Sequence, residues 1–197
     1  MAPAVLENTL PSVGATSVVG NNLFSLANRT VAITGGGRGL GLNMAIAIAE
    51  SGGNVACIDI LEQPPVEDWA QLQKAATTNN VHISYHRCDV TAEKDVEDVL
   101  ELISADAETL GAPFAGMIAA AGITQLIPAL DYPAADFDRV MRVNVTGVFN
   151  TCKHTARIWR RKERTGSIVI IASISGSVAN RVRILRNLML RSLDGHD

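Results

Sequence analysis

The stretch TGGGRGLG, Thr34 to Gly41, joins two segments of different periodicity. Residues 30–34 (TVAIT) form a short apolar run typical of a buried strand, and residues 40–51 have the apolar spacing of a helix. Glycines here allow a tight turn, close approach of the backbone to a pyrophosphate, and close packing of the helix on the strand. The helix N-terminus adds free amides and a partial positive charge. The stretch therefore predicts a phosphate-binding turn, although the glycines alone are equally compatible with a purely structural one.

Strands and helices alternate along the rest of the chain. Further strands are expected at residues 54–60, 81–88, 114–120 and 167–172, and helices at residues 69–79, 92–110 and 133–161. Thr91 is the expected N-cap of the second of these helices. The alternation predicts a parallel sheet with helices on both faces, and right-handed crossovers make it a doubly wound, Rossmann-like α/β fold. We expect this sheet to be incomplete after its fifth strand.

The length and composition fit a single domain. Of the 197 residues 47% are hydrophobic and the formal net charge is −3, which excludes a chain that is disordered throughout. No apolar run reaches the roughly eighteen residues of a membrane span. We expect a loosely ordered leader over residues 1–27, a dinucleotide-binding domain over residues 28–180 and an atypical basic tail over residues 181–197. The leader lacks the features of a signal peptide or a mitochondrial presequence.

The three cysteines indicate a reducing environment. Cys57, Cys88 and Cys152 are far apart and odd in number, so they form neither a disulfide framework nor a cluster of metal ligands. Two of them fall in strand-like runs, which favours buried free thiols over a reactive role. We therefore predict no metal site and a cytoplasmic location.

Charge is distributed unevenly along the chain. Residues 1–150 hold seven Lys or Arg and seventeen Asp or Glu, whereas residues 151–197 hold ten basic and three acidic residues. A basic end can indicate an anionic partner. Here the basic residues lack interleaved aromatic residues apart from Trp159, and they match no nucleic-acid-binding module. A solvated helix face over residues 157–164 is favoured, with neither a nucleic acid nor a membrane as partner.

Asp59 closes the second predicted strand, 24 residues after Gly35. A carboxylate at this place can accept hydrogen bonds from the ribose hydroxyls of an adenosine, and it would repel a 2′-phosphate. Arg38 has the opposite effect, because a basic group near the ribose can pair with that phosphate. The balance favours NAD as the cofactor, with NADP as the weaker alternative.

The glycine spacing TGxxxGxG departs from the strict G-x-G-x-x-G pattern and resembles that of the short-chain dehydrogenase/reductase family. The resemblance covers about residues 29–180. The amino-acid sequence around residues 23–33 and 166–181 is most similar to that of fungal polyol and sugar-alcohol dehydrogenases. This similarity implies a polyol and a ketose as the substrate pair. The other motifs, which follow in the order of the family, are Cys88-Asp89-Val90, Ala119-Ala120-Ala121-Gly122, Asn144-Val145-Thr146-Gly147 and the strand from Gly166 to Ser173.

The resemblance implies hydride transfer between a nicotinamide and a secondary alcohol or ketone. It gives Ser173 a hydrogen bond to the substrate oxygen and Asn144 the anchoring of a water relay; bonding to local backbone is the alternative for each. It also places Asp89 against the adenine. The cofactor-binding residues it implies are Gly35, Gly37, Arg38, Gly39, Leu40, Gly41, Asp59, Asp89, Val90, Ala121 and Gly122.

The proton donor of the family is missing from the expected place. In the family a Y-x-x-x-K motif follows the strand that ends in the substrate-binding Ser, but here Tyr85 and Tyr132 both precede Ser173 and no Lys follows Lys162. A tuned proton donor contributes about 10²–10⁴-fold to rate. Impaired turnover is therefore predicted, and a non-catalytic NAD(P)-binding or regulatory protein is the alternative. The family is commonly homo-oligomeric through the same helix, so we expect this interface helix to be missing here.

The tail suggests a reason for this departure. Permitted codons for Leu188 to Ser192, read from the third base, encode Tyr-Ala-Ser-Lys, which resembles the Y-x-x-x-K motif of the family but has one residue fewer between Tyr and Lys. We therefore expect that the tail is an out-of-frame reading and that the domain is truncated. Sequencing the transcript tests this hypothesis.

Overall fold

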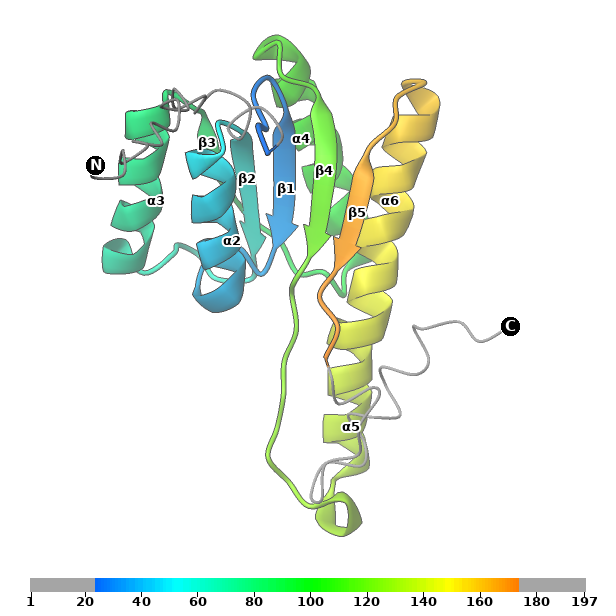
Figure 1. Ribbon diagram of the computed structural model, residues 1–197. Helices are drawn as coiled ribbons and strands as arrows, with labels where there is room; N and C mark the ends of the chain where they lie inside the picture. Colours follow the sequence, from blue (N-terminus) through cyan, green and yellow to red (C-terminus); the bar gives the residue numbers. More distant parts are fainter. Residues whose placement is uncertain (1–23, 174–197) are drawn as a thin grey trace, which may run out of the picture.

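A five-stranded parallel sheet forms the centre of the computed structural model, which describes residues 24–173 (Figure 1). The strands lie in the order β3-β2-β1-β4-β5. Their bounds are β1 Thr30–Thr34, β2 Asn54–Asp59, β3 Ile83–Arg87, β4 Phe114–Ala119 and β5 Ser167–Ile170. The strand order reverses at β1, as in a doubly wound fold, so the predicted α/β architecture is confirmed.

Helices cover both faces of the sheet, and each face has its own apolar core. On one face, α2 (Gly39–Glu50) and α3 (Val66–Asn79) bury Leu42 and Leu72 against β1 and β2. On the other face, α4 (Glu93–Thr109) and α6 (Val148–Arg161) bury Leu100 and Trp159 against the sheet. All five strands run in parallel, so their carboxyl ends meet at one edge of the sheet.

The helical stretch expected at residues 133–161 consists of three segments. It begins as α5 (Ala134–Met141), continues as a π turn, η2 (Arg142–Gly147), and ends as α6. Figure 1 shows this rod extending well beyond the sheet at its α5 end. π turns are rare and often lie at functional sites, and this one contains Asn144.

The predicted N-cap at Thr91 is wrong. The N-cap of α4 is Ala92, which makes no side-chain capping bond. The backbone amide and the hydroxyl of Thr91 both donate to Asp89 Oδ1, at 2.9 and 2.8 Å. The hydroxyl is therefore used in the turn that precedes the helix.

The ends of the chain lie largely outside the described residues. The predicted tail over 181–197, its proposed change of frame and residues 1–23 of the predicted leader all fall there. Within residues 24–27, Leu26 packs against the core under α2, and its amide donates to the carbonyl of Ser51 at 2.9 Å.

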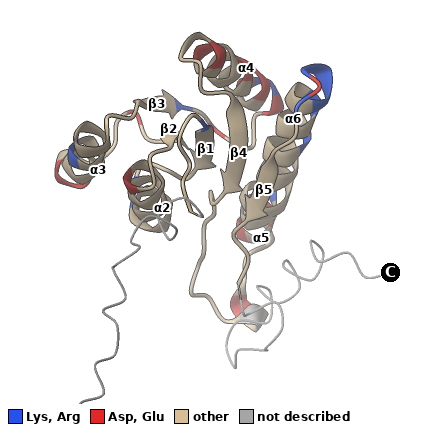
Figure 2. Ribbon diagram, turned by 45° about the horizontal axis from the view of Figure 1, so that its top comes forward, with Lys and Arg blue, Asp and Glu red and all other residues tan. Residues whose placement is uncertain are grey.

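Of the basic residues over 157–164, the four arginines are exposed, as expected, and Lys162 is half-buried. Three of these five basic residues pair with α4. Arg161 Nη2 lies 2.6 Å from Glu101 Oε2, and Lys162 and Arg164 both pair with Glu108. Figure 2 shows the acidic residues of α4 beside the basic end of α6. The uneven charge of the sequence is thus partly compensated within the chain. None of the helices described has both the length and the apolar composition needed to cross a membrane.

Candidate functional site

A cleft of about 410 Å³ opens at the carboxyl ends of the strands. Ligands of doubly wound proteins bind at this edge, where the strand order reverses. Ten of the predicted cofactor-binding residues line the cleft: Gly35, Arg38, Gly39, Leu40, Gly41, Asp59, Asp89, Val90, Ala121 and Gly122. The fold therefore brings together segments that follow β1, β2, β3 and β4.

The glycine turn has almost no room for side chains at its base. Gly35 has φ +70°, a conformation that L-residues rarely adopt, and a Cβ at Gly41 would lie 2.1 Å from the carbonyl oxygen of Gly35. Gly39 differs, because an added Cβ would meet no atom within 4 Å. The turn is thus packed tightly against α2 and open above Gly39.

The N-terminus of α2 faces this open space. Arg38 is its N-cap and makes no side-chain capping bond, and no acidic residue occupies the first turn. The first amides of a helix lack partners within the helix and carry a partial positive charge. The backbone at Gly39 and the space above it therefore fit the diphosphate of a dinucleotide.

Asp59 is held rigidly at the end of β2. Its carboxylate is 9% exposed and accepts hydrogen bonds from the amides of Gly37 at 3.0 Å and Leu61 at 3.2 Å. Gly37 does not line the cleft, so the structure gives it a role in orienting Asp59. Arg38, on the same side, is exposed.

Cys88, Asp89 and Val90 form the wall after β3. The Asp89 side chain is bonded to Thr91, and the Val90 carbonyl accepts a hydrogen bond from Asn150 Nδ2 at 3.2 Å. Burial, with smaller effects from the charges of Asp95 and Asp89, raises the pKa of the Cys88 thiol to about 12. The thiol is therefore protonated at neutral pH and is a poor nucleophile.

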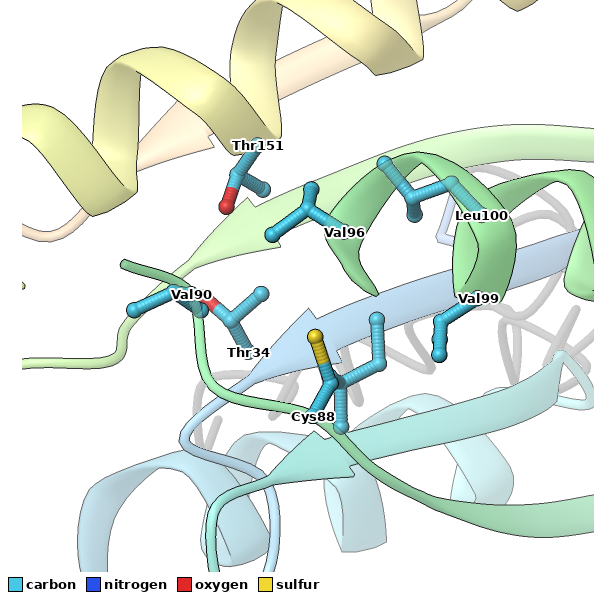
Figure 3. Close-up of a pocket in the computed structure, with 8 residues that line it drawn as sticks. Thr34, Cys88, Val90, Val96, Val99, Leu100 and Thr151 are labelled. Carbon is cyan, nitrogen blue, oxygen red and sulfur yellow. The ribbon is translucent and has the colours of Figure 1, made fainter. Parts of the chain in front are cut away.

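Beneath this wall lies a small apolar hollow between the sheet, α4 and α6. It has no space for a water molecule. Figure 3 shows the side chains around it: Thr34, Cys88, Val90, Val96, Val99, Leu100 and Thr151. Because Ile58, Cys88 and Val90 line both spaces, they form the partition between the hollow and the cleft.

The opposite wall follows β4 and depends on a residue that was not predicted as part of the site. The hydroxyl oxygen of Thr34 accepts hydrogen bonds from the amides of Ala120 and Ala121, both at 3.2 Å. It ties the end of β1 to the chain after β4. Thr34 stands directly before the glycines, which is the signal that could have identified it.

Asn144 lies behind the same wall. Its Nδ2 donates to the carbonyl of Ile123 and its Oδ1 accepts from the amide of Ile123, both at 2.9 Å. Ile123 and Val143 line the cleft. The side chain of Asn144 thus bonds backbone and fixes the cleft wall. Ser173 lies shortly after the end of β5, half-buried and outside the lining of the cleft.

Both tyrosines of the chain are used elsewhere. The hydroxyl of Tyr85 donates to the carbonyl of Leu61 at 2.8 Å, and burial, followed by the charge of Asp59, raises its pKa to about 12. The hydroxyl of Tyr132 donates to Gln125 Oε1 at 2.9 Å. Neither residue lines the cleft. Over residues 24–173, no group of three His, Cys, Asp or Glu side chains is placed to hold a metal ion.

Comparison with known proteins gives a consistent result. The sequence profile of a family described as short chain dehydrogenase matches residues 29–184. A short-chain dehydrogenase/reductase of Aspergillus versicolor, notP′, is 39% identical over 171 residues, which are 87% of this chain and 58% of the relative. The chain therefore spans less than two thirds of the length of this relative.

Two solved structures show the same architecture. An NAD⁺-bound xylitol dehydrogenase has a TM-score of 0.74 at 25% identity, covering 85% of this chain and 62% of its own. An NADPH-dependent 3-quinuclidinone reductase of Rhodotorula rubra has a TM-score of 0.75 at 26% identity, covering 96% of this chain and 68% of its own.

Proposed function

The chain belongs to the short-chain dehydrogenase family, and from this membership we propose that it takes part in hydride transfer between a nicotinamide dinucleotide and a secondary alcohol or ketone. A single observation carries the proposal. The N-terminus of α2, the open backbone at Gly39 and the carboxylate of Asp59 line one cleft at the reversal of strand order. This arrangement offers amides to a diphosphate and an acceptor to a ribose.

We propose NAD as the cofactor, which when bound supplies the acceptor or donor of the hydride. Asp59 would accept hydrogen bonds from the ribose hydroxyls and disfavour a 2′-phosphate. Arg38 supports NADP, and the two similar structures named above include one with NAD⁺ and one described as NADPH-dependent. Asp89 and Val90 would contact the adenosine half of the cofactor. Ala121 and Gly122 would contact the part of the cofactor that lies nearer to Asn144.

We propose a polyol or sugar alcohol as the substrate and a cytoplasmic location. The similarity to a xylitol dehydrogenase supports the substrate. Ser173 would bond the substrate oxygen, and Asn144 would hold the wall beside it. The family suggests a homo-oligomer as the assembly.

The 197-residue chain should bind the cofactor but convert the substrate only slowly. No Tyr follows Tyr132 in the sequence, and both tyrosines donate their hydroxyls to other groups. Without a tuned proton donor we expect turnover lower by about 10²–10⁴-fold than in an enzyme that has one. Fluorescence titration with NADH and NADPH measures binding. Turnover is measured by the rise in NADH absorbance when NAD⁺ and xylitol or arabinitol are added.

The two readouts separate the proposal from its alternative, a non-catalytic NAD(P)-binding protein. Saturable binding of NADH together with slow but measurable oxidation of xylitol or arabinitol supports the oxidoreductase. If sequencing of the transcript confirms this chain, cofactor binding without any turnover supports the alternative. The alternative is favoured by the hydrogen bonds that both tyrosine hydroxyls donate to other groups. If neither NADH nor NADPH binds, both functions are excluded.

A further inference from the structure

Helix α6 and the last residue of the π turn before it contact the Asp89–Val90 wall of the cleft. Asn150 is 3% exposed, and its Nδ2 donates to the carbonyl of Val90 across 60 residues of sequence. One turn earlier, a Cβ at Gly147 would lie 2.6 Å from Cγ2 of Val90. The backbone of Val90 is therefore fixed by the first turn of α6, and its side chain is confined by the end of the π turn.

The same helical rod also fixes the opposite wall. The π turn that runs directly into α6 contains Asn144, whose side chain bonds both the amide and the carbonyl of Ile123. Two amide side chains on one rod thus hold the loops that follow β3 and β4. Val90 and Ile123, the residues they hold, both line the cleft.

The bond from Asn150 has no substitute among the neighbouring side chains of α6. Thr151 donates its hydroxyl to the carbonyl of Gly147 within the helix, and Lys153 and His154 bond Glu93. A buried carbonyl that loses its donor pays the full cost of leaving water, so the chain would shift to find another partner. Any such shift moves Val90 and, with it, Asp89.

We propose that Asn150 is a positioning residue that holds the Asp89–Val90 wall in place for the adenosine half of the dinucleotide. The inference rests on the proposed function, because it concerns the same cleft. Asn150 does not itself line the cleft, so it acts through Val90.

Binding of ADP-ribose, which contains the adenosine and the diphosphate but no nicotinamide, isolates this half of the site. Asn150→Leu removes the donor and should weaken the binding of ADP-ribose and of NAD by about tenfold each, as expected when one buried hydrogen bond is lost. Thr155→Val is the matched control. Its hydroxyl is on the same helix, fully buried and without a hydrogen-bond partner, so affinity should stay at that of the parent chain.

A second variant adds a pH profile that general destabilisation would not produce. In Asn150→Asp the buried carboxylate cannot donate to the Val90 carbonyl, but its protonated form can. Affinity for ADP-ribose, relative to the parent at the same pH, should be low at pH 8 and should rise as the pH is lowered toward 5. A ratio that does not change with pH contradicts the inference, and this variant also serves if Asn150→Leu does not fold.

The outcomes separate this inference from the proposed function. If Asn150→Leu is folded and binds ADP-ribose within twofold of the parent, the inference is overturned while the function stands. If the parent binds neither ADP-ribose nor NAD, the proposed function fails, and hydrogen exchange of residues 88–92 then decides the inference. Faster exchange in Asn150→Leu supports a positioning role, and unchanged exchange rejects it.

Discussion

At several positions of the cleft, the residue type is restricted by the space available or by the hydrogen bonds that the side chain makes. Gly41 is confined by the carbonyl of Gly35, and Asp59 is held by two backbone amides. Thr34 joins two strands through one hydroxyl. Each of these residues acts on the backbone around the cleft, so a substitution should alter the shape of the cleft as well as its chemistry.

Gly41→Ala should destabilise the fold and abolish cofactor binding. The added Cβ would lie 2.1 Å from a backbone oxygen, which cannot move aside as the end of a side chain can. Overpacking of this kind costs about 1–3 kcal/mol and should lower the Tm by about 5 °C. Gly122→Ala is the control in the same cleft, because its Cβ would lie at an ordinary 3.5 Å from Asn144 Oδ1. Equal melting of the two variants would contradict the steric explanation.

Asp59→Asn should reduce the preference for NAD over NADP. The substitution removes the negative charge that repels a 2′-phosphate but keeps the shape of the side chain. We expect the dissociation constant of NADPH divided by that of NADH to fall by about tenfold, as measured by titration with each cofactor. Glu62→Gln removes a nearby exposed carboxylate that pairs with Arg87 outside the cleft, and it should leave the ratio unchanged. A preference that survives in Asp59→Asn would show that Asp59 does not select the cofactor.

Among the secondary-structure elements, the rod from α5 to α6 has the greatest influence on the site. It is anchored to α4 by Glu93: Glu93 Oε1 forms an ion pair with Lys153 Nζ at 2.5 Å and lies within hydrogen-bond distance, 3.1 Å, of Nε2 of the buried His154. The hydrogen bond from Lys153, and then that from His154, lower the pKa of Glu93. The contribution of Glu93 to the α4–α6 contact therefore depends on its being ionised.

Glu93→Gln should lower the Tm at neutral pH and have no effect in acid. Because the folded-state pKa lies below the unfolded value of 4.5, the stabilisation is present above that value and is lost as the pH falls through the folded-state pKa. We expect a decrease of only about 2 °C near pH 7, because exposed ion pairs contribute little to stability, and convergence with the parent once the pH is below the folded-state pKa of Glu93. Glu67→Gln on α3, exposed and remote from this pairing, is the control. A difference that persists in acid would mean that charge is not the cause.

For the molecule as a whole, the sequence predicts the sheet better than the contacts between helices. The five strands were recognisable because buried apolar runs such as TVAIT end at glycine or polar residues, and Asp59 because it closes one of them. The π turn contains Asn144, whose bonds join it to Ile123, 21 residues earlier, and such contacts form only once the chain is folded. For the same reason the role of Asn150 was not predictable from local pattern. The partner of Thr91 is different, because Asp89 lies only two residues away and a local turn at this Asp was an alternative to the predicted N-cap.

Mapping the backbone amides of the labelled 197-residue chain by NMR during a titration with NAD locates the cofactor directly. If NAD binds as proposed, the signals of Gly35 to Gly41, Asp59 and Val90 should shift in a saturable manner, while those of α3 stay in place. Unchanged signals in the glycine turn with both NAD and NADP, or shifts confined to other parts of the sheet, would contradict the proposed dinucleotide site.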